Sequence, residues 1–263
     1  MYRPRYPSAR PVGIFCPVKT RIRPALVLLL SALTVPLAAQ NTGQTVSVRS
    51  GGKDYVSYLA AGPGAEQKPG IVLVHSFNGL EQGYKDMVDR FASDGFVVLA
   101  VGWQTFEQSP SDATVERLVR DGVAMLKARS DVDPSRIGLT GFCAGGRYTM
   151  LLLPVIDDFA AGVAWYGFPY SGGSAAQPVR PVDEIDRLSH PLLMIHGSAD
   201  QASPITNIFN YATALQKASK YFELKVYEGQ PHGFMVQNGQ LRKDSIGLDA
   251  YQEMVTFFHR NLG

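Results

Sequence analysis

One segment, residues 137–147, constrains the fold of this chain more than any other; its sequence is IGLTGFCAGGR. Its first four residues form a short apolar run that predicts a buried strand. Residues 144–153 predict a helix, which a proline then ends. Gly141 and Gly145 stand two residues on either side of Cys143, where a tight turn brings backbones together. The pattern indicates a nucleophile elbow, with cysteine in the position that serine more often occupies.

Such a turn would give the Cys143 side chain unusual chemical properties. It would lift the sulfur clear of the sheet and direct the first amides of the helix at whatever the sulfur attacks. The positive end of the helix dipole would also favour thiolate over thiol. The alternative is a buried and inert thiol, which is a common role for a free cysteine.

The rest of the chain alternates between strand and helix patterns. Residues 45–48 and 55–60, with Gly51 and Gly52 between them, predict an antiparallel edge hairpin. The alternation predicts an α/β fold whose central sheet is mostly parallel and has helices on both faces. In such sheets functional residues collect at the carboxyl ends of the strands. The other predicted strands are 71–74, 96–100, 137–140, 161–165, 192–195 and 222–226, and the predicted helices are 84–93, 112–129, 144–153, 207–218 and 248–261.

Residues 1–39 are predicted to be a secretory signal peptide. Six basic residues and no acidic one occur in this stretch, and the apolar run at 25–39 ends in small residues. The run has 15 residues, fewer than the ~20 that span a bilayer, which favours a cleaved signal over a membrane anchor. We therefore expect one α/β-hydrolase domain over residues 40–263, exported to the periplasm or the medium.

Removal of this leader changes the charge of the protein. The whole chain has 25 basic and 23 acidic residues, so loss of six basic ones leaves 19 against 23, a net charge of −4. The overall basicity thus belongs to the leader and gives no reason to expect nucleic acid or anionic membrane as a partner. Of the two cysteines, Cys16 lies in the leader and only Cys143 remains. An exported domain with one cysteine has no internal disulfide, so this thiol needs another explanation.

Two residues downstream could activate the Cys143 thiol. His232 lies in a glycine-flanked loop after the last predicted strand, and Asp200 follows the strand before it. The imidazole would take the proton of the thiol, and the carboxylate would hold the imidazole in place. The order nucleophile, acid, histidine is the one that α/β-hydrolases use. These three residues are the predicted catalytic set, and no metal site is predicted because metal-ligand spacing is absent.

Each of these residues also has a simpler interpretation. A loop histidine such as His232 is often a surface group, and Asp200 could cap the next helix. Among the other histidines, His190 and His196 flank a strand and are expected to be structural, and His259, near the end of the last helix, is expected to be a solvated cap. The joint occurrence of the three predicted residues, each just past its own strand, favours the catalytic interpretation.

Acyl transfer also requires donors for the oxyanion and a pocket for the substrate. The predicted donors are the amide of Ala144, directly after the nucleophile, and the amide of Phe77, in the loop after residues 71–74. Aromatic residues near strand ends are candidates for an acyl or lactone pocket, although packing at its rim is an equal alternative. The predicted substrate-binding residues are Ser76, Trp103, Tyr166 and Phe234, and Phe168 and Tyr170 lie in the same regions. Arg147, on the elbow helix, is expected to form a structural ion pair.

From about residue 72 to its end the chain resembles the dienelactone hydrolase family, the cysteine-dependent branch of the α/β-hydrolases. The resemblance implies hydrolysis of lactones or related small-molecule esters by Cys143, Asp200 and His232, without metal or organic cofactor. We expect no nucleic acid, no stable membrane anchor and a monomer. The resemblance rests on the segments 72–80, 95–99, 133–147, 165–167, 196–200 and 227–234.

Two positions depart from the pattern of this family. Members with dienelactone activity have a glutamate where this chain has Ser76, and that carboxylate is thought to hold the proton of the resting thiol. Cys143 would then rest as a thiolate–imidazolium pair unless Glu81 reaches in, and Ser76 cannot hold the proton. The family also has an arginine four residues after the histidine, where this chain has Val236. Both changes argue against the dienelactone itself as substrate while leaving the chemistry in place.

Three functional hypotheses follow from the sequence. The favoured one is an exported cysteine hydrolase of small esters or lactones that works through a thioester acyl-enzyme. The second is acyl transfer or polyester cleavage by the same three residues, which analysis of products with water and alcohol acceptors would distinguish. The third is a non-catalytic binding protein with the hydrolase fold, for which a thiol unreactive toward iodoacetamide near pH 6 would be the mark.

Overall fold

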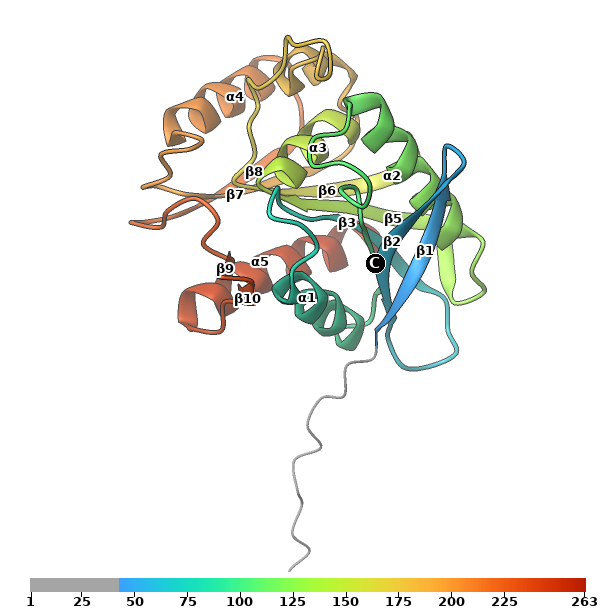
Figure 1. The fold of residues 1–263 in the computed structure, drawn as a ribbon. Coiled ribbons are helices and arrows are strands. Elements are labelled where there is room, and N and C mark those ends of the chain that lie inside the picture. The colour runs from blue at the N-terminus through green and yellow to red at the C-terminus, as the bar shows by residue number, and fades with distance from the viewer. Residues whose placement is uncertain (1–42) are drawn as a thin grey trace, which may run out of the picture. The chain divides into compact units, whose positions relative to one another are not determined.

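An eight-stranded sheet forms the centre of the protein in the computed structural model, which describes residues 43–263 (Figure 1). The strand order is β1-β2-β4-β3-β5-β6-β7-β8. The pairs β1–β2 and β2–β4 are antiparallel, and all other neighbours in the sheet are parallel. The strands are β1 (Gln44–Ser50), β2 (Lys53–Ala61), β3 (Lys68–Val74), β4 (Val97–Val101), β5 (Val132–Phe142), β6 (Phe159–Trp165), β7 (Leu192–Gly197) and β8 (Phe222–Tyr227).

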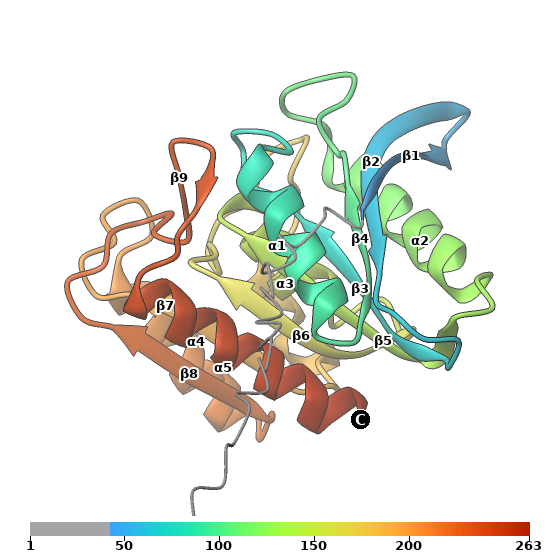
Figure 2. The same cartoon turned by 90° about the horizontal axis from the view of Figure 1, so that it is seen from below.

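Helices cover both faces of this sheet. Side chains of α2, α3 and α4 pack into one apolar core, and those of α1 and α5 pack into a second one on the opposite face. Figure 2 shows α1 and α5 in front of the strands. Alternate residues of β3 serve the two cores, because successive side chains of a strand point to opposite faces. The helices are α1 (Gln82–Ser93), α2 (Asp112–Lys127), α3 (Ala144–Leu152), α4 (Ile205–Lys217) and α5 (Ser245–Leu262).

The predicted α/β architecture with a mostly parallel sheet is confirmed, including the antiparallel edge hairpin. The predicted helix at 112–129 is α2, whose apolar residues recur at helical spacing and form a buried stripe that faces the sheet. Two small features escaped prediction: the 3₁₀ helix η1 (Pro181–Arg187) and the hairpin of β9 (Val236–Gln237) with β10 (Gln240–Leu241). Two-residue strands are too short to show a periodic pattern. The predicted signal peptide lies outside the described residues, and no helix within residues 43–263 is long and apolar enough to cross a membrane.

The turn between β5 and α3 has the strained geometry that the sequence predicts. Cys143 has φ 57° and ψ −113°, in a region that residues other than glycine rarely adopt. A Cβ at Gly141 would collide with the backbone carbonyl of Gly145, and a Cβ at Gly145 would collide with the carbonyl of Val74. The two glycines are therefore required by the close approach of β3, β5 and α3 at this point, and the approach places Cys143 above the carboxyl end of the sheet.

Candidate active site

Cys143 lies at the carboxyl end of β5, as the first residue before α3, and is half-buried. Its amide donates to the carbonyl of Trp165 on the neighbouring strand at 3.1 Å, and its carbonyl accepts from the Arg147 amide at 3.0 Å. The backbone on both sides of the sulfur is thus held by strand and helix, so the strained turn has little freedom to relax. Cys143 lines two separate cavities, one small and one large.

The loops after β7 and β8 bring Asp200 and His232 together. His232 Nδ1 donates to Asp200 Oδ2 at 2.8 Å. The other oxygen, Oδ1, accepts from the amides of Ala202 and Ser203 at 2.9 and 2.8 Å, so both oxygens are engaged. Burial by itself would raise the pKa of Asp200, but the hydrogen bonds from His232 and Ser203 hold that pKa below its usual value. The carboxylate is therefore charged and fixed, with one oxygen committed to the imidazole.

The other nitrogen of His232 faces the thiol. Nε2 is buried, and among the described residues no hydrogen bond of standard geometry reaches it. Burial lowers the pKa of His232, but the Asp200 carboxylate and the neighbouring Cys143 side chain outweigh burial and raise the pKa to about 9. Both neighbours therefore favour the imidazolium form of His232, and the side chain next to its Nε2 is that of Cys143.

His196, for which the sequence predicts only a structural role, also contacts the carboxylate of Asp200. It is buried at the end of β7, and its Nε2 donates to the carbonyl of Ser203 at 2.8 Å while lying 3.3 Å from Asp200 Oδ2. Burial lowers the pKa of His196. A neutral imidazole here supports the loop that carries Asp200. Asp200 itself does not cap α4, whose N-cap is Pro204.

Phe77 and Ala144, the two predicted oxyanion donors, both lie beside Cys143 and line the larger cavity. Within residues 43–263, neither amide has a hydrogen-bond acceptor in the protein. The carbonyl of Phe77 accepts from the side-chain amides of Gln104 and Gln108, at 3.0 and 2.8 Å. These two glutamines hold the loop after β3 in place, and nothing in the local sequence pattern could have singled them out.

The smaller cavity, of about 60 Å³, lies on the histidine side of the sulfur. Ser76 is buried there, and its hydroxyl accepts from the Asn78 amide at 3.2 Å. Tyr166 also lines it, and burial raises the pKa of its hydroxyl well above the usual value. Val236 completes the wall, but Glu81 is not among the lining residues, so no carboxylate stands next to the thiol in this cavity.

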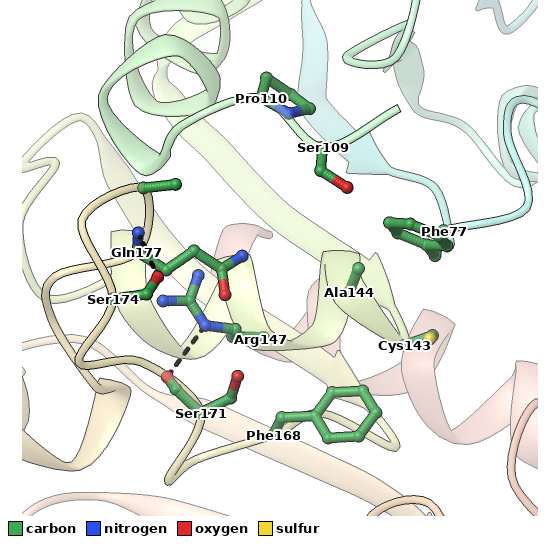
Figure 3. A pocket seen from close by; sticks show the side chains of 11 residues that line it. Phe77, Ser109, Pro110, Cys143, Ala144, Arg147, Phe168, Ser171, Ser174 and Gln177 are labelled. Atoms are coloured by element: carbon green, nitrogen blue, oxygen red, sulfur yellow. Dashed lines mark hydrogen bonds between the residues drawn. The ribbon is translucent and has the colours of Figure 1, made fainter. Parts of the chain in front are cut away.

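The larger cavity, of about 490 Å³, extends from the other side of Cys143. In Figure 3 the aromatic rings of Phe77 and Phe168 lie near Cys143, and Gln177 and Ser174 lie at the opposite end. A substrate that approaches the sulfur would therefore pass the two aromatic rings, and polar residues would face the end of the substrate that lies farthest from the sulfur. The complete lining is Phe77, Ser109, Pro110, Cys143, Ala144, Arg147, Phe168, Ser171, Ser174, Ala176 and Gln177.

Two of the predicted substrate-binding residues lie in the core instead. Trp103 is buried, donates its indole N–H to the His75 carbonyl at 3.1 Å and stacks on the His75 ring at 5.4 Å. Phe234 is fully buried and packs against Trp165 and Tyr166. Neither lines a cavity that Cys143 lines. Position near a strand end could not distinguish them from Phe168, because the side chain's direction depends on the neighbouring loops.

Comparison with known proteins agrees with the fold. The family model described as "Dienelactone hydrolase family" matches residues 56–262. A "Putative carboxymethylenebutenolidase" of Methylorubrum extorquens is 30% identical over 209 residues, which cover 73% of this chain and 72% of that protein. A "Probable 2-oxo-3-(5-oxofuran-2-ylidene)propanoate lactonase" of Bradyrhizobium is 26% identical, over 72% of this chain and 82% of that protein.

A solved structure shows the same fold at lower identity. The crystal structure titled "Putative Dienelactone Hydrolase" from Klebsiella pneumoniae superposes with a TM-score of 0.76 at 24% identity, covering 83% of this chain and 98% of that one. An esterase of Thermogutta terrifontis has a TM-score of 0.71 at 20% identity, over 84% of this chain and 95% of that one. The extent of the family match, together with the sheet order and the elbow, leads to one conclusion: this chain belongs to the dienelactone hydrolase family and is a hydrolase with the α/β-hydrolase fold.

Proposed function

We propose that this protein is an exported hydrolase of small esters or lactones, with Cys143 as nucleophile, His232 as proton carrier and Asp200 as the group that orients it. The observation that carries the proposal is the hydrogen-bonded pair of buried Asp200 and half-buried His232 beside a half-buried thiol on a strained turn. The names of the relatives, carboxymethylenebutenolidase and lactonase, support cleavage of an ester or lactone bond.

In the first half of the reaction the thiolate of Cys143 attacks the carbonyl carbon of the ester. The carbonyl oxygen takes the negative charge and accepts from the amides of Ala144 and Phe77. When the tetrahedral intermediate collapses, His232 donates its Nε2 proton to the departing alkoxide oxygen, and a thioester remains on Cys143. In a lactone the departing oxygen stays attached to the acyl group, so no product leaves at this stage.

In the second half of the reaction, water attacks the thioester. The now neutral imidazole of His232 removes a proton from water as the oxygen attacks the thioester carbon. Collapse of the second intermediate breaks the C–S bond, releases the carboxylic acid and restores the thiolate beside the imidazolium. Asp200 stays ionised throughout, because its charge stabilises the imidazolium at both steps.

The resting enzyme is proposed to hold a thiolate–imidazolium pair. Ser76 stands where related enzymes have a glutamate that holds the proton of the thiol, and no carboxylate lines the small cavity. The raised pKa of His232 supports the same resting state, since the proton lost by Cys143 would stay on the imidazole.

Alkylation tests this resting state together with the proposed function. The purified enzyme is expected to hydrolyse p-nitrophenyl acetate, and iodoacetamide at pH 6 is expected to abolish turnover at least about tenfold faster than it alkylates glutathione, because the thiolate is the reactive form. Mass spectrometry of the inactivated protein checks that Cys143 carries the label. A thiol that stays unlabelled at pH 6 would contradict the proposal and favour a non-catalytic binding protein.

The pH profile gives a second test. We expect kcat/KM to fall as pH rises through about 9, because His232 is protonated below that pH and cannot protonate the leaving oxygen above it. Asp200→Asn removes the carboxylate that raises this pKa, so the falling limb should move toward lower pH. Initial rates with an alkyl ester between pH 6 and 10 measure both profiles, because a departing alkoxide needs the proton of His232 whereas a p-nitrophenolate does not. A wild-type rate that climbs through pH 9 would mean that neutral imidazole is the required form.

Export rests on the sequence of residues 1–39 alone. Expression of the full chain with its leader is expected to deliver a protein shortened near residue 39 to the periplasm or the medium, because the basic end and short apolar run have the layout of a cleaved signal. N-terminal sequencing of the exported protein checks the cleavage position. Retention of the full-length chain inside the cell would argue against export.

A further inference from the structure

We propose that the substrate is uncharged on the part that enters the large cavity beside Cys143, so that the enzyme prefers neutral esters or lactones to those bearing a carboxylate. This inference rests on the proposed function, because it concerns the selectivity of the same site. It follows from which side chains of the cavity wall are charged and from the partners that already neutralise them.

The polar groups of the cavity wall are almost all neutral. Hydroxyl groups come from Ser109, Ser171 and Ser174, and a primary amide comes from Gln177. Figure 3 shows Ser109 and Gln177 along the far side of the cavity from Phe168. Such groups both donate and accept hydrogen bonds, so they can satisfy ether, hydroxyl or carbonyl oxygens of a substrate. They carry no charge that would compensate an anion.

Arg147 is the one cationic side chain among the described residues that line this cavity, and its charge is already paired. Its guanidinium binds Asp112 in a bidentate ion pair, with N···O distances of 2.8 and 2.9 Å. Further bonds go to the carbonyls of Ser171 at 3.1 Å and Val179 at 2.9 Å. The side chain is only 3% exposed. These bonds use four of the five guanidinium N–H groups, so an incoming carboxylate could reach at most the remaining N–H of Nη1. It would have to share the positive charge of Arg147 with the Asp112 carboxylate, which is already held in a buried bidentate pair.

The small cavity on the other side of the sulfur does not supply a cation for the substrate either. Val236 and Ser76 line it with an apolar and a neutral polar side chain. Its one ionisable imidazole, His232, is paired with Asp200 at 2.8 Å. A carboxylate placed there would meet the thiolate of Cys143 at close range, and two negative charges at such a distance repel each other.

Charge therefore discriminates between substrates of the same shape. A carboxylate that leaves water without meeting a free cation loses its hydration and gains nothing that replaces it. A neutral ester of equal size loses far less, and the serine and glutamine groups can replace the hydrogen bonds that its oxygens made with water. The cavity of about 490 Å³ has room for an acyl group of several carbon atoms beyond the scissile bond.

The experiment compares two p-nitrophenyl esters of adipic acid, one with the second carboxylate free and one with it methylated. The two differ in charge with nearly the same shape, and the longer chain prevents the fast attack of the free carboxylate on its own ester that a shorter diacid would allow. With rates corrected for uncatalysed hydrolysis, kcat/KM is expected to be at least about a hundredfold higher for the methyl ester at pH 7.5. Equal values, or a preference for the free carboxylate, would overturn the inference.

Binding to the inactive Cys143→Ala variant separates this inference from the proposed function. If wild-type enzyme hydrolyses neither ester, the proposed function fails, and competition binding still decides the selectivity. Stronger binding of the methyl ester to the variant would then support the neutral cavity, and stronger binding of the free carboxylate would refute it.

Two substitutions at Gln177 form a matched pair that tests whether the charge of the cavity decides selectivity. Gln177→Arg adds a free cation to the wall and is expected to reduce the preference for the methyl ester at least about tenfold. Gln177→Met removes the same amide without adding charge and is expected to keep the methyl ester strongly preferred, in contrast to Gln177→Arg. If Gln177→Arg shows the wild-type ratio while it still hydrolyses the methyl ester, the charge of the cavity does not decide selectivity and the inference fails.

Discussion

Replacement of Cys143 by alanine is expected to lower kcat for aryl ester hydrolysis by about 10⁴-fold or more. The sulfur forms the bond to the acyl group in the proposed mechanism, and none of the residues lining its two cavities offers a second nucleophile at the same turn. The remaining activity would come from the two oxyanion donors and from binding alone. Steady-state kinetics with p-nitrophenyl acetate measure the loss.

Alanine at this position keeps the protein folded, because its side chain is smaller than the one it replaces and the turn keeps its glycines. Circular dichroism and thermal unfolding check this point. Cys143→Ser is the matched control for the nucleophile, since it preserves the elbow and exchanges sulfur for oxygen, whose hydroxyl His232 must deprotonate during attack. A Cys143→Ala variant with undiminished turnover would eliminate Cys143 as nucleophile.

Replacement of His232 by alanine is expected to cause a loss of similar size, about 10⁴-fold in kcat. Without the imidazole the thiol has no partner that takes its proton, the leaving oxygen receives none, and Asp200 remains buried without its ion-pair partner. Because the two residues act as one unit, the double variant lacking both Cys143 and His232 is expected to be little worse than either single variant. Multiplicative losses would indicate that they act independently.

His259 provides a control for the loss of an imidazole as such. It is exposed near the end of α5, and its ring lies tilted against that of Phe96 with centroids 4.7 Å apart. Helix α5 packs on the face of the sheet opposite to α3. His259→Ala is expected to leave kcat unchanged within about twofold, since a surface substitution away from the site rarely alters it. If His232→Ala behaved like His259→Ala, the proposed proton carrier would be wrong.

Much of the fold was predictable because its signals are local. The apolar run of β3 and the stripe of α2 reflect periodicities of the backbone itself, so they appear in any window of the chain. The elbow was predictable for a different reason: Gly141 and Gly145 are required by contacts between backbones, which only residues without a side chain allow. The leader at 1–39 stays a prediction.

The site was predictable only in part. The order of Cys143, Asp200 and His232 along the chain predicted a pairing between the last two, and the hydrogen bond of 2.8 Å confirms that they meet. Position near a strand end also pointed to Trp103 and Phe234, which the structure places in the core. A side chain that follows a strand end can point into the active site or into the apolar core, and the local sequence is similar in both cases.

The sequence by itself determined the class of fold, the strained turn under Cys143 and the expected structural ion pair of Arg147. Only the tertiary structure decided which carboxylate that arginine binds, since Asp112 lies 35 residues away on another helix. The same is true of the glutamines that hold the Phe77 carbonyl and of the charge of the cavity. Periodicity and turn chemistry act between near neighbours in the chain, whereas these contacts depend on how whole helices and loops pack against the sheet.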